Sequence, residues 1–79
     1  MPQPDIVLYG RDGCHLCEEA RVLLDTMLGR DRYRRVDIDT DDDLLVAYAY
    51  RIPVIAVDGV DRLEAPITGP DVRALLTDR

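Results

Sequence analysis

Two cysteines, Cys14 and Cys17, are the only ones in the chain, and two residues separate them. They stand where an apolar run at residues 6–9 gives way to a pattern of helical periodicity. A bridge between them would close a very small loop, and the stabilisation that a disulfide provides grows with loop length. A purely structural cross-link is therefore not expected, and the pair indicates redox or metal chemistry in a reducing compartment.

The position of Cys14 suits a thiol nucleophile. The thiolate is the form that attacks disulfides, and a free cysteine with a pKa of about 8.5 is only a few per cent ionised at pH 7. At a helix N-terminus, free backbone amides and the helix dipole favour the anion. We therefore predict that Cys14 is the exposed nucleophile and that Cys17, one turn further along the helix, is the resolving thiol. Arg11 and a protonated His15 would add positive charge nearby, whereas the two glutamates that follow Cys17 oppose it.

Two other classes of function stay open at this point. Thiolates also bind Cu(I) or Zn(II), so Cys14 and Cys17 are candidates for a soft-metal site. No further cysteine and no separate histidine completes a tetrahedral ligand set. Alternatively, the chain is a binding module that keeps the fold without the activity.

Composition narrows the choice of partners. The chain has 79 residues, the size of one domain, and we expect residues 1–79 to form it. Its formal net charge of −6 argues against a nucleic-acid partner, and the basic cluster at residues 30–35 is interpreted as a solvated loop and strand edge. No apolar run approaches the roughly 20 residues of a membrane span, and the first residues show no signal-peptide pattern. We expect a cytoplasmic monomer that does not bind membranes.

The periodicity of the apolar residues predicts an α/β domain with the element order β-α-β-α-β-β-α. The expected strands span residues 6–9, 33–39, 52–57 and 60–63. The expected helices span residues 14–28, a segment that follows 40–43 and runs to about 49, and a last segment that begins at 68–70. The apolar stripe of the first helix consists of Leu16, Ala20, Leu23, Leu24 and Met27. Thr40 is the expected N-cap of the second helix.

The character of each strand predicts its place in the sheet. Residues 6–9 and 52–57 are apolar without alternation, which is typical of strands covered on both faces. Residues 33–39 alternate and carry charges on both faces, as expected at an edge. Asp58-Gly59 is a hairpin signal that pairs the third strand with the fourth. We therefore expect a four-stranded mixed sheet of order 2-1-3-4 with helices on both faces.

Two segments carry a family resemblance. Residues 7–17, which read Val-Leu-Tyr-Gly-Arg-Asp-Gly-Cys-His-Leu-Cys, resemble the active-site segment of glutaredoxins in the thioredoxin superfamily. Ile52-Pro53-Val54 followed by Asp58-Gly59 is similar to the proline loop and hairpin of that superfamily. The likeness extends from the first strand to the last helix and is closest to small bacterial glutaredoxin-like proteins with Cys-His-Leu-Cys-type sites. It implies a thioredoxin-like fold and a thiol–disulfide oxidoreductase that reduces protein or glutathione mixed disulfides.

The resemblance also implies roles for single residues. Cys14 matches the nucleophile and Cys17 the resolving cysteine. Arg11 matches a basic residue that meets the glycyl carboxylate of glutathione. His15, which follows Cys14 directly, is a further predicted substrate contact. Pro53 matches a cis-proline beside the thiols. Ile52 would offer backbone hydrogen bonds to a bound peptide or to glutathione, which is one candidate reductant; no bound cofactor is implied.

Three positions depart from the pattern of the family. His15-Leu16 stands where Pro-Tyr is common, and Arg51 replaces the usual threonine before the Val-Pro pair, which here is Ile52-Pro53. The Gly-Gly-x-x-Asp segment that grips the γ-glutamyl end of glutathione is reduced to Thr68-Gly69-Pro70-Asp71. Asp71 is the remaining candidate to meet an ammonium group there. The identity of the disulfide substrate is left open.

Overall fold

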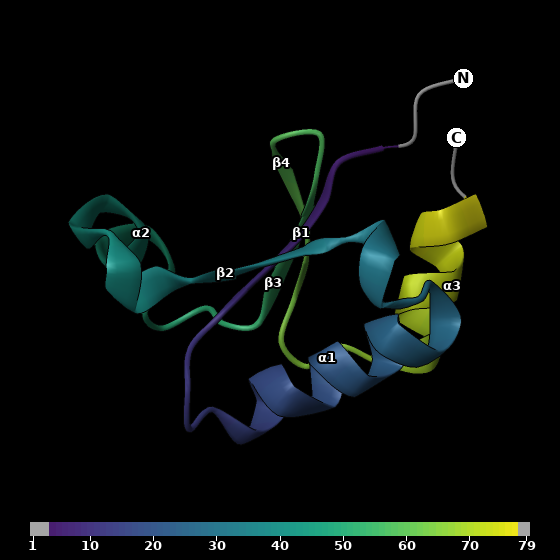
Figure 1. Ribbon diagram of the computed structural model, residues 1–79, viewed down its shortest axis with the longest axis horizontal. Coiled ribbons are helices and arrows are strands. Elements are labelled where there is room, and N and C mark those ends of the chain that lie inside the picture. Colours follow the sequence, from purple (N-terminus) through teal and green to yellow (C-terminus); the bar gives the residue numbers. More distant parts are fainter. Residues whose placement is uncertain (1–3, 78–79) are drawn as a thin grey trace.

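The computed structural model describes residues 4–77, and its helices and strands follow the predicted order. The strands are β1 (Ile6–Gly10), β2 (Arg34–Asp37), β3 (Val54–Val57) and β4 (Val60–Glu64). The α-helices are α1 (His15–Met27), α2 (Asp42–Tyr48) and α3 (Gly69–Thr77), and short 3₁₀ helices, η1 (Arg30–Arg32) and η2 (Ile38–Thr40), lie before and after β2. In Figure 1, α1 and α3 lie side by side, and α2 lies at the opposite end of the molecule.

The sheet has the predicted strand order, β2-β1-β3-β4. Strand β1 runs parallel to β2 and antiparallel to β3, and β3 runs antiparallel to β4. The hairpin between β3 and β4 turns at Asp58 and Gly59, which both have positive φ, 52° and 84°. A two-residue hairpin turn of type I′ requires positive φ at both central residues, so this prediction is confirmed as well.

One face of the sheet packs against α1 and α3. Alternation along β1 directs Ile6 and Leu8 to this face, where their cross-strand partners are Val57 and Ile55. Ala20, Leu24 and Val72 complete the buried cluster from the helices. This face is an aliphatic core of ordinary kind, built without phenylalanine or tryptophan.

Helix α1 begins and ends within one residue of the prediction, with Cys14 as its N-cap and Leu28 as its C-cap. Its buried residues are Cys17, Ala20 and Leu24. They recur every three or four residues and therefore share the face that meets the sheet. The prediction that Leu16 belongs to this stripe is wrong: its side chain lies beside the stripe and is 48% exposed.

Helix α2 covers the opposite face of the sheet. Val7 and Ala56, which pair across β1 and β3, face this side and are buried. Tyr9 of β1 stacks on Tyr48 of α2, with ring centroids 4.4 Å apart. Helices therefore cover both faces, as predicted, although α2 itself has no fully buried residue.

Two local predictions before α2 are wrong. The second strand ends at Asp37, because the Asp37 carboxylate accepts the backbone N–H two residues on and the chain turns into η2. The N-cap of α2 is Asp41 and not Thr40, since the Asp41 carboxylate accepts from the N–H groups of Asp43 and Leu44. The Thr40 hydroxyl instead donates to the carbonyl of Asp37 at 2.6 Å.

Helix α3 begins at Gly69 with Pro70 in its first turn, as predicted. The connection that leads to it from β4 contains a cis Ala65–Pro66 bond, which the sequence did not predict. None of the helices within residues 4–77 is long and apolar enough to cross a membrane.

Candidate active site

Cys14 and Cys17 are joined by a disulfide at the N-terminus of α1. Cys14 is the N-cap residue, and its Sγ accepts a hydrogen bond from the backbone N–H of Cys17 at 3.1 Å. Cys14 is half-buried, whereas Cys17 is only 7% exposed. The first turn of α1 thus directs a backbone N–H at the more accessible of the two sulfurs, which is the arrangement that an anionic sulfur at Cys14 requires.

Gly10 determines how closely Cys17 approaches the sheet. A Cβ atom added at Gly10 would lie 3.1 Å from the Cβ and 3.2 Å from the Sγ of Cys17. These distances are shorter than ordinary carbon–carbon and carbon–sulfur contacts, so even a methyl group at residue 10 would require Cys17 to shift slightly. Glycine at the end of β1 therefore allows Cys17 to lie against the strand without this shift.

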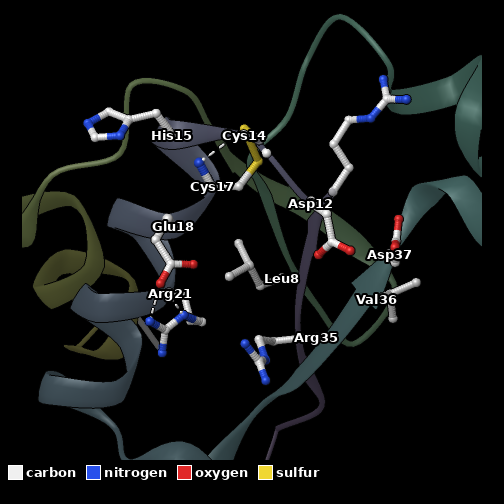
Figure 2. Close-up of a pocket in the computed structure, with 13 residues that line it drawn as sticks. Leu8, Asp12, Cys14, His15, Cys17, Glu18, Arg21, Arg35, Val36 and Asp37 are labelled. Atoms are coloured by element: carbon white, nitrogen blue, oxygen red, sulfur yellow. Dashed lines mark hydrogen bonds and ion pairs between the residues drawn. A yellow bond between two sulfur atoms is a disulfide. The ribbon is translucent and has the colours of Figure 1, made fainter.

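A cavity of about 710 Å³ opens beside the disulfide, between α1 and β2 (Figure 2). Four predicted site residues line it: Arg11, Cys14, His15 and Cys17. The other charged residues of its lining are Asp12, Glu18, Arg21, Arg35 and Asp37. Three predicted site residues, Ile52, Pro53 and Asp71, do not belong to this lining.

Most of the arginines at the cavity already have partners. Arg11 forms a two-pronged ion pair with Asp39, with the shorter contact at 2.8 Å. Arg21 pairs with Glu18 and, at 2.7 Å, with Asp25, and its hydrogen bond to Glu18 lowers the pKa of that carboxyl. Arg35 has no ion pair and no side-chain hydrogen bond to any residue among 4–77.

The predicted proline lies at the same end of the central strands β1 and β3 as the cysteines. The Ile52–Pro53 peptide bond is cis, as the resemblance implies. Tyr9 pairs with Val54 in the antiparallel β1–β3 ladder, so one step further out Pro53 lies level with Gly10. Because β1 ends at Gly10 and leads directly into the loop before Cys14, the proline and the thiols share this end of the sheet.

This combination of a dithiol at the first helix and a cis-proline at the neighbouring strand agrees with the family comparison. A model of the glutaredoxin-like domain (DUF836) matches residues 5–77. The chain belongs to this glutaredoxin-like family. No curated protein sequence matches the chain.

Solved structures support the same assignment. The chain is 36% identical to the protein XcR50 from X. campestris, with a TM-score of 0.81 over 94% of this chain and 97% of the other. A thioredoxin from Halobacterium salinarum gives 19% identity and a TM-score of 0.67, with 92% and 71% of the two chains covered. A buckwheat glutaredoxin in complex with glutathione gives 18% identity and a TM-score of 0.60, with 95% and 70% covered. The last two show the thioredoxin-like fold and no more.

Arg51, which departs from the glutaredoxin pattern, clamps the segment before Pro53. Its Nε donates to Glu64 at 2.8 Å and its Nη2 donates to Asp61 at 3.0 Å, so both bonds reach β4. The guanidinium also lies over the ring of Tyr48, 5.1 Å from the ring centroid. The end of α2, the proline segment and β4 are therefore tied together by one side chain.

Asp71, the other departure, takes part in the cap of α3. Its Oδ2 accepts from the backbone N–H of Thr68 at 3.1 Å, while the Thr68 hydroxyl accepts from the N–H of Asp71 at 3.3 Å. This reciprocal pair is a capping box in which aspartate takes the place of the usual glutamate. The predicted contact of Asp71 with an ammonium group stays a prediction.

His15 lies at the rim of the site. Its side chain is 89% exposed and pairs with Glu19 at 3.2 Å, and its ring points away from the cavity in Figure 2. Within the described residues, no group of three or more His, Cys, Asp and Glu side chains could hold a metal ion.

Three residues that position or line the site did not emerge from sequence reasoning: Gly10, Arg35 and Arg51. The glycine directly after an apolar strand and before the dithiol loop is the signal that could have indicated the close contact at Gly10. Arg35 was included only in the basic cluster at residues 30–35. Arg51 was recognised only as a replacement for threonine.

Proposed function

We propose that the chain is a thiol–disulfide oxidoreductase in which Cys14 attacks the substrate and Cys17 resolves the intermediate. The observation that carries the proposal is the position of the Cys14 sulfur, which caps α1 and accepts the N–H of Cys17. A capping sulfur is stabilised as an anion by the same free amides that stabilise a capping carboxylate.

The reaction transfers two electrons to the substrate in two exchange steps. The Cys14 thiolate attacks one sulfur of a substrate disulfide, and the other substrate sulfur leaves as a thiolate that takes up a proton. Cys17 then loses its proton and attacks the Cys14 sulfur of the mixed disulfide. The second substrate thiolate leaves, and the chain ends with the Cys14–Cys17 bond, which an external thiol reductant must reduce again.

Burial favours this division of roles over the reverse. Cys17 is 7% exposed and lies against Gly10, so it offers a substrate sulfur less access than Cys14 does. Cys14 lies at the mouth of the cavity and is the more exposed sulfur. An intramolecular attack by Cys17 on Cys14 needs only the short distance that the first turn of α1 already provides.

Glutathione mixed disulfides or protein disulfides are the substrates we propose, with Arg11 and the backbone of Ile52 as contacts and with Asp71 near an ammonium group. We propose a reducing compartment such as the cytoplasm as the site of the reaction, since re-reduction of the disulfide needs a thiol pool.

The test compares two electron sources on the intact chain. Glutathione with glutathione reductase is supplied for a small mixed disulfide, and thioredoxin reductase is supplied for insulin. We expect turnover with at least one source, its complete loss in Cys14→Ser, and an accumulated mixed disulfide on Cys14 in Cys17→Ser. Activity that survives Cys14→Ser, or a wild-type chain that turns over with neither source, would refute the proposal.

A further inference from the structure

We propose that Arg35 recognises a carboxylate on the substrate, so that the cavity between α1 and β2 selects small disulfides with anionic arms. This inference rests on the proposed function, because it concerns the substrates of the same dithiol. The inference places the residue that selects the substrate on the β2 side of the disulfide. Pro53 lies on the other side, directly before β3.

Arg35 is placed by the sheet to face the cavity. It pairs with Leu8 in the parallel β1–β2 ladder, and Leu8 faces α1. Figure 2 shows the Arg35 side chain extending from β2 toward α1, with Arg21 on the opposite wall and the disulfide at the other end of the cavity. The guanidinium therefore lines the same space as the two sulfurs.

The charge of Arg35 is available to a ligand. Arg11 is held by Asp39, and Arg21 is held by Glu18 and Asp25. Arg35, by contrast, has no ion-pair partner among residues 4–77, although it lies near enough to Glu18 to lower the pKa of that carboxyl through its charge, as a minor contribution beside the hydrogen bond from Arg21. A guanidinium presents a planar pair of donors that suits a carboxylate, and such bonds are stronger than neutral ones.

The carboxylates that line the cavity compete little with a ligand for the guanidinium of Arg35. Glu18 is engaged by Arg21, and Asp37 accepts the backbone N–H of Asp39. Asp12 belongs to the loop before Cys14, and Figure 2 shows its carboxylate extending from the disulfide end into the cavity, on the side of Asp37. A ligand that places its anionic group beyond Asp12, between Arg35 and α1, meets Arg35.

The distance between Arg35 and the dithiol suits a substrate whose carboxylate lies a few bonds from its sulfur. Gly10, against which Cys17 packs, lies two residues further along β1 than Leu8, the partner of Arg35. Two residues of a strand span about 7 Å. A flexible arginine side chain on one side and a substrate arm of two or three carbons on the other can bridge this distance while a substrate sulfur meets Cys14.

The experiment uses three small disulfides of similar arm length and different charge. They are bis(2-hydroxyethyl) disulfide, which is neutral, 3,3′-dithiodipropionate, which is anionic, and cystamine, which is cationic. The second-order rate constant for oxidation of the reduced chain is measured with each, for wild type, Arg35→Gln, Arg35→Lys and Arg73→Gln. Arg73→Gln is the matched control, because it removes the same charge from an exposed position on α3 that does not line the cavity.

We expect Arg35→Gln to lower the rate constant for the anionic disulfide roughly tenfold, in keeping with the loss of one charge-assisted hydrogen bond. The neutral disulfide should change less than about twofold, Arg35→Lys should keep the preference for the anion because it keeps the charge, and Arg73→Gln should behave as wild type. Equal losses for neutral and anionic disulfides in Arg35→Gln, or no loss for the anion, overturn the inference alone. If wild type reacts with none of the three disulfides, the proposed function fails and this inference fails with it.

Discussion

The two faces of the sheet are held by different kinds of contact. On the α1 and α3 side, Leu24, Ile55 and Val72 are completely buried in an aliphatic cluster. On the α2 side, the strands also bury Val54 and Ala56, but α2 itself buries none of its residues fully and is attached through a ring stack and a cation–π contact at Tyr48. The helices of the first face thus contribute buried aliphatic side chains, whereas the contacts of α2 on the second face position the segment that leads to Pro53.

On the second face, α2 is linked to both β1 and β4 through Tyr48. Tyr9 of β1 stacks on Tyr48, the Tyr48 hydroxyl donates to Asp61 of β4 at 2.9 Å, and Arg51 reaches the same strand. These contacts are partly exposed, so each stabilises the fold modestly. Their common effect is to hold the proline segment at the end of the sheet where the dithiol lies, and we infer that substitutions there act on function more than on stability.

The largest effect on stability is expected from Leu24→Ala on the aliphatic face. Leu24 is 0% exposed, and truncation of such a leucine leaves a cavity that costs about 3 kcal/mol. Urea unfolding measures the loss. Leu16→Ala on the same helix is the matched control, and we expect it to cost under about 1 kcal/mol because Leu16 is 48% exposed. Equal losses for the two variants would contradict the assignment of the core.

The next largest effect is expected on the redox equilibrium of the dithiol, through the contact between Gly10 and Cys17. In Gly10→Ala, the new methyl group would crowd both the Cβ and the Sγ of Cys17, and only the Sγ contact is relieved in the reduced chain, where the sulfur is free to turn away. Overpacking of this kind costs about 1–3 kcal/mol, so the equilibrium constant for disulfide formation against a reference dithiol should fall by about tenfold.

Gly69→Ala is the control for this redox measurement. A Cβ at Gly69 would meet only Leu23 at 3.9 Å, which is ordinary contact, so the equilibrium should remain that of wild type. A Gly10→Ala chain with an unchanged equilibrium would show that Cys17 does not depend on this contact.

On the second face, Arg51→Gln should weaken substrate binding more than it weakens the fold. The variant loses both bonds to β4 and the contact with the Tyr48 ring, which frees the segment before Pro53. We expect KM for a disulfide substrate to rise several-fold while the free energy of unfolding falls by less than in Leu24→Ala. Steady-state kinetics and urea unfolding measure the two quantities.

Arg34→Gln is the control for Arg51, since it breaks an exposed ion pair with Asp5 at the edge strand β2, away from the proline. It should leave KM unchanged. If both variants raise KM equally, the effect of Arg51 comes from the charge of the chain and not from its hold on the proline segment.

The smallest effect is expected from Tyr48→Phe, which keeps the ring stack and removes the hydroxyl. Burial, and then the hydrogen bond to Asp61, raise the pKa of Tyr48 from 10.0 to about 12. Because the folded state holds this proton more tightly, the associated stability is complete below pH 10 and is lost as pH rises toward 12. The hydrogen bond is worth roughly 1 kcal/mol.

Urea unfolding at several pH values tests this sign. The wild type should exceed Tyr48→Phe in unfolding free energy at neutral pH, and the gap should close between pH 10 and about 12. A gap that stays constant to pH 12 would show that the Tyr48 hydroxyl does not titrate as described. Tyr33, whose pKa burial and Asp25 also raise to about 12, is present in both chains and cancels in the difference.

Sequence reasoning was most successful where a local pattern determines the structure. The unbroken apolar runs at β1 and β3 indicated central strands, the alternation near β2 indicated an edge, and the Asp58-Gly59 pair indicated the hairpin. The bounds of α1 were also predicted to within one residue, because the helical periodicity begins directly after the dithiol loop and ends before Gly29, whose φ is 99°.

It was less successful where residues distant in sequence meet. Arg51 gains its role from Asp61 and Glu64, which a hairpin brings beneath it, and no local pattern indicates that. The cavity exists because α1 leaves space beside an edge strand, so the position of Arg35 on its wall depends on packing and not on spacing. The end of β2 was misplaced for a simpler reason. The alternation of apolar and charged residues continues past Asp37, but a hydrogen bond from the backbone N–H of Asp39 to the Asp37 carboxylate turns the chain out of the strand.

The most direct test of the proposed chemistry is a pH titration of each thiolate by its ultraviolet absorbance, in reduced Cys17→Ser and reduced Cys14→Ser. The backbone amide directed at the Cys14 sulfur predicts that the thiol left in Cys17→Ser ionises well below the ordinary cysteine pKa of about 8.5 and reacts with a small disulfide at neutral pH. The thiol left in Cys14→Ser should ionise at higher pH and react slowly. If the two thiols ionise alike, or if Cys17 is the more acidic, the assignment of the nucleophile is wrong.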